Sequence, residues 1–148
     1  RKKQEGAYTS PVFIDDYAHH PEELKALLRS ARTLFPQRKL TVIFQPHLYS
    51  RTRDFDKEFS KSLSIADRII LLPIYGAREQ PMEGVTSALL LEAISSADKH
   101  LMEKEQLLTW IKDYTRTLDK EFGEVIITAG AGDIDALVQP LKEIIEKA

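Results

Sequence analysis

Short apolar runs without polar alternation recur along the chain, and they constrain its fold more than any other feature. Such runs are typical of parallel strands that are covered on both faces. Four runs are clear, at residues 12–14, 40–44, 68–72 and 124–128, and a weaker fifth candidate lies at residues 99–102. They predict the strands of a sheet that is buried in the middle of the protein.

Amphipathic segments separate these runs and predict helices. Pro21 suits the first position of a helix, and Glu22 and Glu23 favour its first turn, because carboxylates stabilise the positive end of the helix dipole. One face of this helix is marked by Leu24, Leu27, Leu28, Ala31 and Leu34, and that of a second helix by Phe55, Phe59 and Leu63. Three more helices are expected at residues 87–94, 105–118 and 133–147.

The alternation of strands and helices implies right-handed crossovers between parallel strands. We therefore expect an α/β fold, a Rossmann-like three-layer domain with a mostly parallel open sheet flanked by helices. The chain has 148 residues, of which 43% are hydrophobic, so one compact domain with a sizeable core is expected. This domain would span residues 11–148, and the polar residues 1–10 would be a linker or the remnant of a preceding domain.

Charge and composition exclude several functions. The 21 basic and 23 acidic side chains nearly balance, whereas a nucleic-acid-binding protein needs a dominant basic surface. No apolar run approaches the roughly 20 residues of a membrane span, and the basic start of the chain is followed by no apolar signal core. The absence of cysteine excludes disulfides, thiolate metal sites and a cysteine nucleophile, and it suits the reducing cytoplasm.

Unusual residues gather directly after the predicted strands. In an open parallel sheet such segments emerge at the carboxyl edge, where ligands bind near a switch in strand order. The segments comprise residues 15–21, 45–53, 73–83 and 129–133. They contain His19, His20 and His47, three of the four histidines. The sequence therefore predicts one ligand site, built by loops at this edge of the sheet.

The glycine-rich segment before the last helix allows two interpretations. Gly130, Ala131 and Gly132 lead into a helix, whose free N–H groups and dipole suit a phosphate or a carboxylate. The same residues also suit a simple strand-to-helix turn with Asp133 as the N-cap. A dinucleotide fingerprint is excluded because Asp135 replaces the third glycine, and the chain has no Gly-Lys-Ser or Gly-Lys-Thr with which to grip a nucleotide triphosphate.

The aspartate and histidine residues near the first two strands also suggest a metal. Asp15, Asp16, His19, His20 and His47 are ligand types that suit zinc or manganese. Adjacent residues of an extended segment point in opposite directions, however, so the two Asp residues and the two neighbouring His residues cannot all point toward one metal ion. His20, directly before a proline, is expected to be an N-cap or structural residue. We therefore assign no metal ligands.

A small basic cluster follows the second strand. Arg51, together with His47, suits an anionic group of a small substrate, because an arginine binds a carboxylate or phosphate through two hydrogen bonds. Arg53 is more readily explained by pairing with an acidic residue at position 54, 56 or 58 on the surface of its helix.

Two of these segments carry motifs of a known family. Residues 15–21 read Asp-Asp-Tyr-Ala-His-His-Pro, and residues 44–53 read Phe-Gln-Pro-His-Leu-Tyr-Ser-Arg-Thr-Arg. In order and spacing they resemble the carboxy-terminal domain of the Mur ligase family, in particular of the members that act on L-alanine. Residues 129–134, Ala-Gly-Ala-Gly-Asp-Ile, resemble the last strand and loop of that domain. The resemblance runs from about residue 12 to the end of the chain.

This resemblance implies an ATP-dependent ligase that joins L-alanine to UDP-N-acetylmuramate in peptidoglycan synthesis. In that family an amino-terminal domain binds the UDP-sugar, a central domain carries the P-loop and the magnesium ligands, and the carboxy-terminal domain closes over ATP. ATP phosphorylates the sugar-linked carboxylate, and the amine of the amino acid attacks the acyl phosphate. This chain would be cytoplasmic, would supply the L-alanine site and part of the ATP site, and would hold no cofactor and be inactive by itself.

The resemblance assigns nucleotide contacts to the segment after the first strand. Asp16 would bind the ribose of ATP, and Tyr17 would lie beside the nucleotide. His19 would lie near the γ-phosphate, where it would be a catalytic residue.

Contacts to the amino acid are assigned to two other segments. His47 and Arg51 would orient L-alanine through its carboxylate. The loop that would assist them consists of Gly130, Ala131, Gly132 and Asp133. Leu48 departs from the family, since many members have arginine directly after the histidine, so Arg51 would carry more of the binding or another residue would replace the missing contact.

Two functions from other classes are kept as alternatives. One is a stand-alone module that binds a nucleotide or another anion at the strand ends. The other is a small metal-dependent hydrolase that uses the aspartate and histidine residues.

Overall fold

The computed structural model of the chain describes residues 10–147, in which five strands form one sheet. The strands are β1 (Val12–Asp16), β2 (Lys39–Phe44), β3 (Arg68–Leu71), β4 (Lys99–Leu101) and β5 (Glu124–Ala129). Their order across the sheet is β1-β5-β2-β3-β4, and all neighbouring strands are parallel. All predicted strands are confirmed, including the weaker candidate. The linker predicted at residues 1–10 lies, except for its last residue, outside the described residues.

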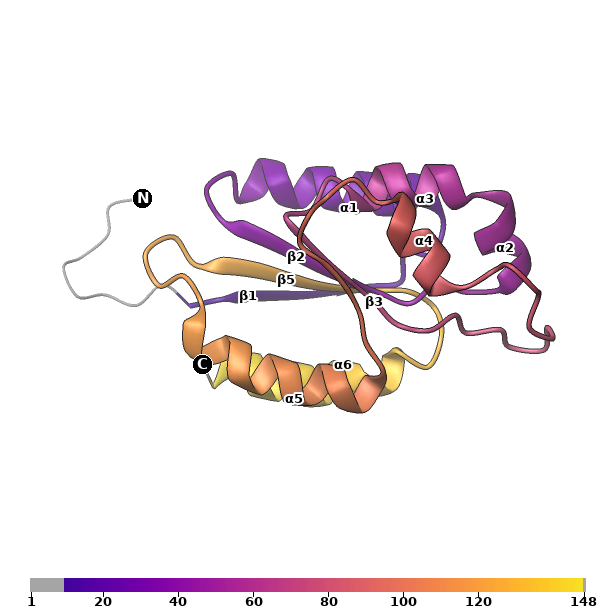
Figure 1. The fold of residues 1–148 in the computed structure, drawn as a ribbon. Coiled ribbons are helices and arrows are strands. Elements are labelled where there is room, and N and C mark those ends of the chain that lie inside the picture. The colour runs from indigo at the N-terminus through magenta and orange to yellow at the C-terminus, as the bar shows by residue number, and fades with distance from the viewer. Residues whose placement is uncertain (1–9, 148) are drawn as a thin grey trace.

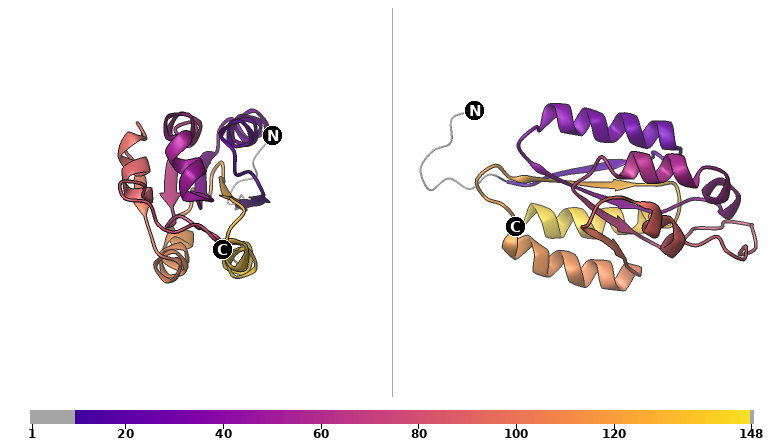
Figure 2. Two further views of the ribbon diagram at one scale, coloured as in Figure 1. Left: turned by 90° about the vertical axis from the view of Figure 1, so that its right-hand side faces the viewer. Right: turned by 45° about the horizontal axis from the view of Figure 1, so that its top comes forward.

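Helices cover both faces of the sheet and complete three layers (Figure 1). On one face lie α1 (Pro21–Leu34), α3 (Asp56–Leu63) and α4 (Ser87–Ala93), and on the other lie α5 (Lys104–Tyr114) and α6 (Asp135–Glu146). The short α2 (Tyr49–Asp54) follows β2, and Figure 2 shows the sheet end-on between its helical layers. The predicted three-layer α/β fold is therefore confirmed. Among the described residues, no helix is both long and apolar enough to cross a membrane.

Each face of the sheet has its own hydrophobic core, and alternate residues of a strand point into the two cores. Val42 and Phe44 of β2 pack with α1 and α3, and the rings of Phe44 and Phe59 have centroids 5.5 Å apart. Ile43 packs on the opposite side with Ile111 of α5. Burial of such a side chain contributes roughly 1.5–3 kcal/mol. Strands that are buried on both faces consequently lack polar alternation.

The structure corrects some details of the expected helices. Leu34 is 71% exposed, because α1 ends there and the next residue, Phe35, packs against the core instead. The expected second helix is divided at Phe55, whose backbone leaves the helical conformation between α2 and α3 and whose side chain is 41% exposed. The helix expected at residues 105–118 ends at Tyr114 and continues as the 3-10 helix η1 (Thr115–Thr117).

Candidate functional site

The carboxyl ends of four strands finish level with one another. Asp16 of β1 pairs with Ala129 of β5, which pairs with Phe44 of β2, and Phe44 pairs with Leu71 of β3. The segments that leave from this row are those in which the sequence predicts a ligand site. The parallel sheet therefore brings these four segments to one edge.

His47 and Arg51 form a pair at this edge. Nη1 of Arg51 donates a hydrogen bond to Nδ1 of His47 at 3.0 Å. Because a guanidinium can only donate, the proton of the neutral imidazole is on Nε2. Partial burial and the positive charges of Arg51 and His19 lower the pKa of His47 below its ordinary value of 6.5. The ring is therefore neutral at pH 7 and presents an N–H donor.

Tyr75, from the segment after β3, covers the ring of His47. The two rings stack with centroids 5.8 Å apart and an angle of 16° between their planes. The backbones are also joined, because Leu48 N–H donates to the carbonyl of Tyr75 at 2.8 Å and Tyr75 N–H donates to that of Pro46 at 2.9 Å. Leu48 has a φ of 72°, which is uncommon for a residue with a side chain. These bonds hold it in that conformation, from which α2 begins.

Glu79 fastens the long segment between β3 and α4 to the start of α2. Its carboxylate accepts a hydrogen bond from Ser50 N–H at 3.0 Å and another from the Ser50 hydroxyl. These hydrogen bonds lower the pKa of Glu79. Since Ser50 precedes Arg51, the contact fixes the turn of helix that carries the arginine.

The segment after β1 brings His19 beside His47, with their ring centroids 6.0 Å apart. Nδ1 of His19 donates to the carbonyl of Tyr17 at 2.8 Å, which leaves Nε2 as the free ring nitrogen. Tyr17 is 69% exposed. One oxygen of Asp16 accepts a hydrogen bond from Ala18 N–H at 2.8 Å and turns the chain. The predicted nucleotide contacts thus lie next to the predicted amino-acid contacts.

His20 occupies the N-cap of α1, as its place before Pro21 predicts. The carboxylate of Glu23 accepts hydrogen bonds from the backbone N–H groups of His19 at 3.1 Å and His20 at 3.0 Å. These bonds lower the pKa of Glu23. The helix start therefore fixes the backbone on which His19 is presented.

The aspartate and histidine residues do not gather into a metal site. Asp15 accepts a hydrogen bond from the hydroxyl of Thr128 at 2.8 Å, whereas Asp16 bonds to its own loop. Within residues 10–147, no group of three or more histidines and carboxylates could hold a metal ion. The alternative of a metal-dependent hydrolase therefore gains no support from the geometry.

The loop after β5 packs tightly against Gln45 and Tyr75. Gly130 has a φ of 137°, and a Cβ there would lie 2.9 Å from the backbone oxygen of Gln45. A Cβ on Gly132 would lie 2.6 Å from Oε1 of Gln45 and 2.7 Å from Cβ of Tyr75. Neither approach leaves room for a side chain. This close packing favours the interpretation of the segment as a strand-to-helix turn.

Asp133, however, is not the N-cap of α6, a position that Ile134 occupies. The N-cap prediction is wrong because the Asp133 carboxylate turns away, accepting hydrogen bonds from Nε2 of Gln45 at 2.6 Å and from Nζ of Lys104 at 2.5 Å. Burial alone would raise the pKa of Asp133, but these two hydrogen bonds outweigh it and lower the pKa.

The sequence assigned no role to four residues of this edge, namely Gln45, Tyr75, Glu79 and Lys104. The first three stand in segments that follow predicted strands, and this position was the available signal. Lys104 begins α5 just after β4, the strand with the weakest apolar run. Nothing local indicates which side chains these residues contact. Arg53, by contrast, forms the predicted surface pair, with Nε 2.8 Å from Oδ1 of Asp54.

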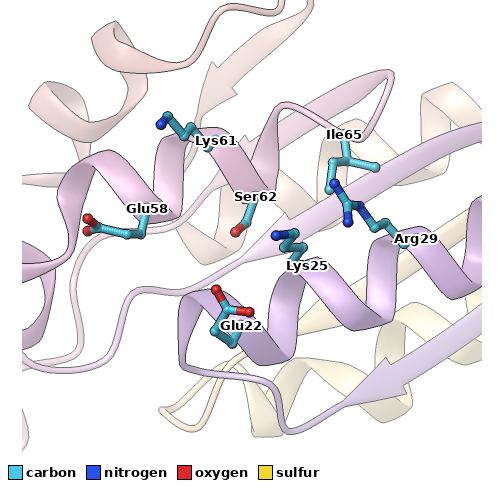
Figure 3. A pocket seen from close by; sticks show the side chains of 7 residues that line it. All are labelled: Glu22, Lys25, Arg29, Glu58, Lys61, Ser62 and Ile65. Carbon is cyan, nitrogen blue, oxygen red and sulfur yellow. The ribbon is translucent and has the colours of Figure 1, made fainter.

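A separate hollow of about 220 Å³ lies between α1 and α3 (Figure 3). Its lining residues are Glu22, Lys25, Arg29, Glu58, Lys61, Ser62 and Ile65. None of the predicted site residues lines it. The candidate site is therefore the carboxyl edge of the sheet.

Comparison with known proteins identifies the class to which this fold and edge belong. The family model described as "Mur ligase, glutamate ligase domain" matches residues 3–132. The chain therefore belongs to the Mur ligase family, as the two motifs suggest.

Curated relatives narrow the comparison to one kind of ligase. The UDP-N-acetylmuramate–L-alanine ligase of Cytophaga hutchinsonii is 51% identical over 139 residues, which are 94% of this chain and 28% of that protein. The ligase of the same name from Porphyromonas gingivalis is 47% identical over 135 residues, covering 91% of this chain and 28% of that protein. The chain thus spans little more than a quarter of the length of these relatives.

Solved structures share the fold. UDP-N-acetylmuramate–alanine ligase from Thermotoga maritima has a TM-score of 0.59 and 25% identity, and the match covers 91% of this chain and 26% of that one. A ligase domain from Haemophilus ducreyi has a TM-score of 0.60 and 19% identity, and the match covers 97% of this chain and 99% of that one. The second likeness shows the fold alone, in a chain of similar extent.

Proposed function

We propose that this chain is the amino-acid-binding and ATP-closing domain of a ligase that joins L-alanine to UDP-N-acetylmuramate in peptidoglycan synthesis. Family membership and the names of the relatives support this proposal. The observation that carries it is the pair of Arg51 and His47 at the carboxyl edge. The proposed domain spans residues 11–148 and works together with the UDP-sugar-binding and ATPase domains.

The Arg51–His47 pair suits the carboxylate of L-alanine. None of the ion pairs within residues 10–147 involves Arg51, so its charge is open to a ligand. One guanidinium nitrogen donates to His47, and the others are left to bind a carboxylate in bidentate fashion. The N–H of His47 at Nε2 supplies a further donor. Leu48 has no charge to add, so Arg51 carries the ionic part of the interaction.

The segment after β1 faces the nucleotide in this proposal. The exposed ring of Tyr17 lies beside ATP, and the Asp16 oxygen that is not bonded to Ala18 binds the ribose. Nε2 of His19, free because Nδ1 is bonded to a carbonyl, contacts the γ-phosphate and makes His19 the catalytic residue of this chain. Transfer of a phosphoryl group and attack by an amine depend mainly on positioning and charge neutralisation.

ATP and magnesium are proposed as cofactors of the complete ligase, with neither held by this domain alone. A Mur-family ligase of similar fold from Thermotoga maritima, at a TM-score of 0.56 and 18% identity, was solved with ADP. The described residues include no group of three or more histidines and carboxylates that could hold a metal ion, and the chain has no Gly-Lys-Ser or Gly-Lys-Thr. We place the complete ligase in the cytoplasm, consistent with the absence of cysteine.

The assigned amino-acid site is tested in the complete ligase with Arg51→Ala. Loss of hydrogen bonds from a charged group is worth about 1.5–3 kcal/mol, so we expect the KM for L-alanine to rise about 10- to 100-fold. The KM for ATP should change little. Arg53→Ala, which removes an exposed ion pair with Asp54 and an exposed contact with the sulfur of Met82, is the matched control and should change neither constant. Equal increases in both KM values after Arg51→Ala would contradict the assignment.

The stand-alone binding module is tested with the isolated chain. Isothermal titration with ATP and with L-alanine should show no tight binding if the domain depends on the rest of a ligase. Tight binding of either compound would favour the module instead. Ligation of L-alanine to UDP-N-acetylmuramate by the isolated chain would overturn the proposal that it is inactive alone.

A further inference from the structure

Gln45 is the first residue after the central strand β2, and it is only 4% exposed. Its side chain makes three hydrogen bonds to two other segments. Nε2 donates to the carbonyl of Pro73 at 3.2 Å and to Oδ1 of Asp133 at 2.6 Å, and Oε1 accepts from Ile134 N–H at 2.8 Å. One buried amide thus connects the end of β2 with the segments that follow β3 and β5.

These partners allow only one orientation of the amide. The carboxylate of Asp133 can only accept a hydrogen bond, and Ile134 N–H can only donate one. A flipped amide would place oxygen against oxygen and N–H against N–H. Because the site is buried, water does not compensate for such mismatches, and each unsatisfied group costs about 1–3 kcal/mol. The amide therefore specifies the relative position of the segments it joins.

The glycines of the loop after β5 are shaped around this amide. Gly130 lies against the backbone of Gln45, and Gly132 lies against the Gln45 side chain and Tyr75, where a Cβ on Gly132 would be 2.6 Å from Oε1. The loop can approach so closely only because both residues lack a side chain. The spacing of these glycines is thus explained by contact with Gln45 and Tyr75.

The connection continues from Gln45 to the proposed carboxylate site. Pro73, which accepts the Gln45 hydrogen bond, is two residues from Tyr75. Tyr75 stacks on His47, and His47 is bonded to Arg51. A displacement of the segment after β3 would consequently move the surface against which the His47 ring rests.

We propose that Gln45 is a positioning residue, which sets the position of the Arg51–His47 pair relative to the loop after β5. The hydrogen bonds of Gln45 to Pro73, Asp133 and Ile134 form a tie between the segments. Asp133 belongs to this tie instead of contacting the amino acid. This inference rests on the proposed function for the identity of the ligand. The Asp133 carboxylate is occupied by Gln45 and Lys104, so the loop faces L-alanine through its backbone.

The tie is tested first in the isolated chain, by NMR and without any ligand. Gln45→Met has a side chain of similar length and removes all three hydrogen bonds, whereas the control Gln139→Met makes the same change at an exposed position on α6. We expect native-state hydrogen exchange of the Ile134 amide to accelerate about tenfold or more in Gln45→Met, and the ring nitrogen signals of His47 to shift. Unchanged exchange and signals would overturn the positioning role.

The role of Asp133 is tested in the complete ligase with two variants, which also serve if Gln45→Met does not fold. Asp133→Asn keeps an oxygen that can accept the hydrogen bond from Gln45, and Asp133→Ala does not. We expect a KM for L-alanine near the original value for Asp133→Asn and one about tenfold higher for Asp133→Ala, with kcat less affected. Equal increases in both variants would show that the Asp133 charge matters and the hydrogen bond from Gln45 does not, and would overturn the inference.

The two experiments separate this inference from the proposed function. If Ile134 exchange is faster in Gln45→Met but the complete ligase does not use L-alanine, the inference about Gln45 stands and the proposed substrate is rejected. Unchanged exchange, combined with a large effect of Arg51→Ala on the KM for L-alanine, would reject the tie and leave the proposed function intact.

Discussion

The amino and carboxyl ends of the sheet both carry polar side chains, but they use them differently. At the amino end, Glu124 begins β5, is 3% exposed, and accepts hydrogen bonds from the Tyr114 hydroxyl and from Asp119 N–H. Burial and the bond to Glu124 raise the pKa of Tyr114. Nε of Arg68 donates to Asp98 at 2.9 Å, and the guanidinium lies 4.3 Å from the centroid of the Tyr114 ring. Most of these groups satisfy one another, although Nη1 of Arg68 is buried without a hydrogen-bond partner among the described residues.

At the carboxyl end the hydrogen bonds among the described residues leave several polar groups free. Arg51 uses one nitrogen on His47, and the exposed Tyr17 and the free Nε2 of His19 face the same edge. The difference teaches that polar residues near a sheet are informative about function when their unused polar groups are exposed, as in Tyr17, and not when they are buried, as in Arg68. The amino-end cluster stabilises the fold, and the carboxyl-end cluster is the proposed place of ligand binding.

The largest expected effect comes from breaking the amino-end cluster with Glu124→Ala. The change leaves the half-buried Tyr114 hydroxyl and Asp119 N–H without their partner, so the free energy of unfolding should fall by about 2–4 kcal/mol. Urea denaturation measures this loss, and Glu146→Ala at the exposed end of α6 should change stability by less than about 0.5 kcal/mol. The His47 ring signals should stay in place. A shifted His47 ring in a folded Glu124→Ala chain would show that the two ends are coupled.

Gly132→Ala should have a smaller effect on stability and a direct one on the site. The new methyl group would clash with Gln45 and Tyr75, and overpacking of this kind costs about 1–3 kcal/mol. Thermal unfolding and the NMR signals of the Tyr75 and His47 rings measure both consequences. Gly84→Ala is the control, since a Cβ there meets nothing within 4 Å and only the φ of 77° opposes it. Ring shifts of equal size in both variants would contradict the proposed contact.

The smallest effect is a difference in pH dependence between the two ends. The pKa of His47 in the folded chain lies below the ordinary value of 6.5, which the unfolded chain keeps. Between these two pKa values the unfolded chain therefore binds more protons than the folded one. The contribution of His47 to stability is therefore complete above pH 6.5 and declines as the pH falls below it. Arg51→Ala should raise the pKa of His47, which NMR titration of the ring measures. An unchanged pKa would contradict the electrostatic coupling of the pair.

Asp98 at the amino end should respond only at more acidic pH. Burial alone would raise its pKa, but hydrogen bonds from His100 and Arg68 outweigh this and lower the pKa below the ordinary 3.8. Its contribution to stability is present above pH 3.8 and is lost as the pH falls through the lowered value. Mild acid should therefore perturb the carboxyl end before the amino end.

Much of the fold could be predicted from local patterns. Apolar runs such as that of β2 and the proline and acidic start of α1 depend on neighbours in the sequence, and the structure confirms them. Leu34 and Phe55 were misassigned because periodicity does not show where a helix ends or breaks. The N-cap prediction for Asp133 failed for a similar reason, since it considered only the following helix and not the distant Gln45 and Lys104.

The sequence by itself determined the parallel α/β class, the carboxyl edge as the place of the candidate site, and the motifs that indicate a Mur ligase. These depend on short-range periodicity and on residues that follow strands directly. Only the tertiary structure decided the strand order, the stacking of Tyr75 on His47, and the ties from Gln45 to Asp133 and from Glu79 to Ser50. Residues 45 and 133 meet because β2 and β5 are neighbours in the sheet, and such pairing is set by the packing of the whole domain and not by any local pattern.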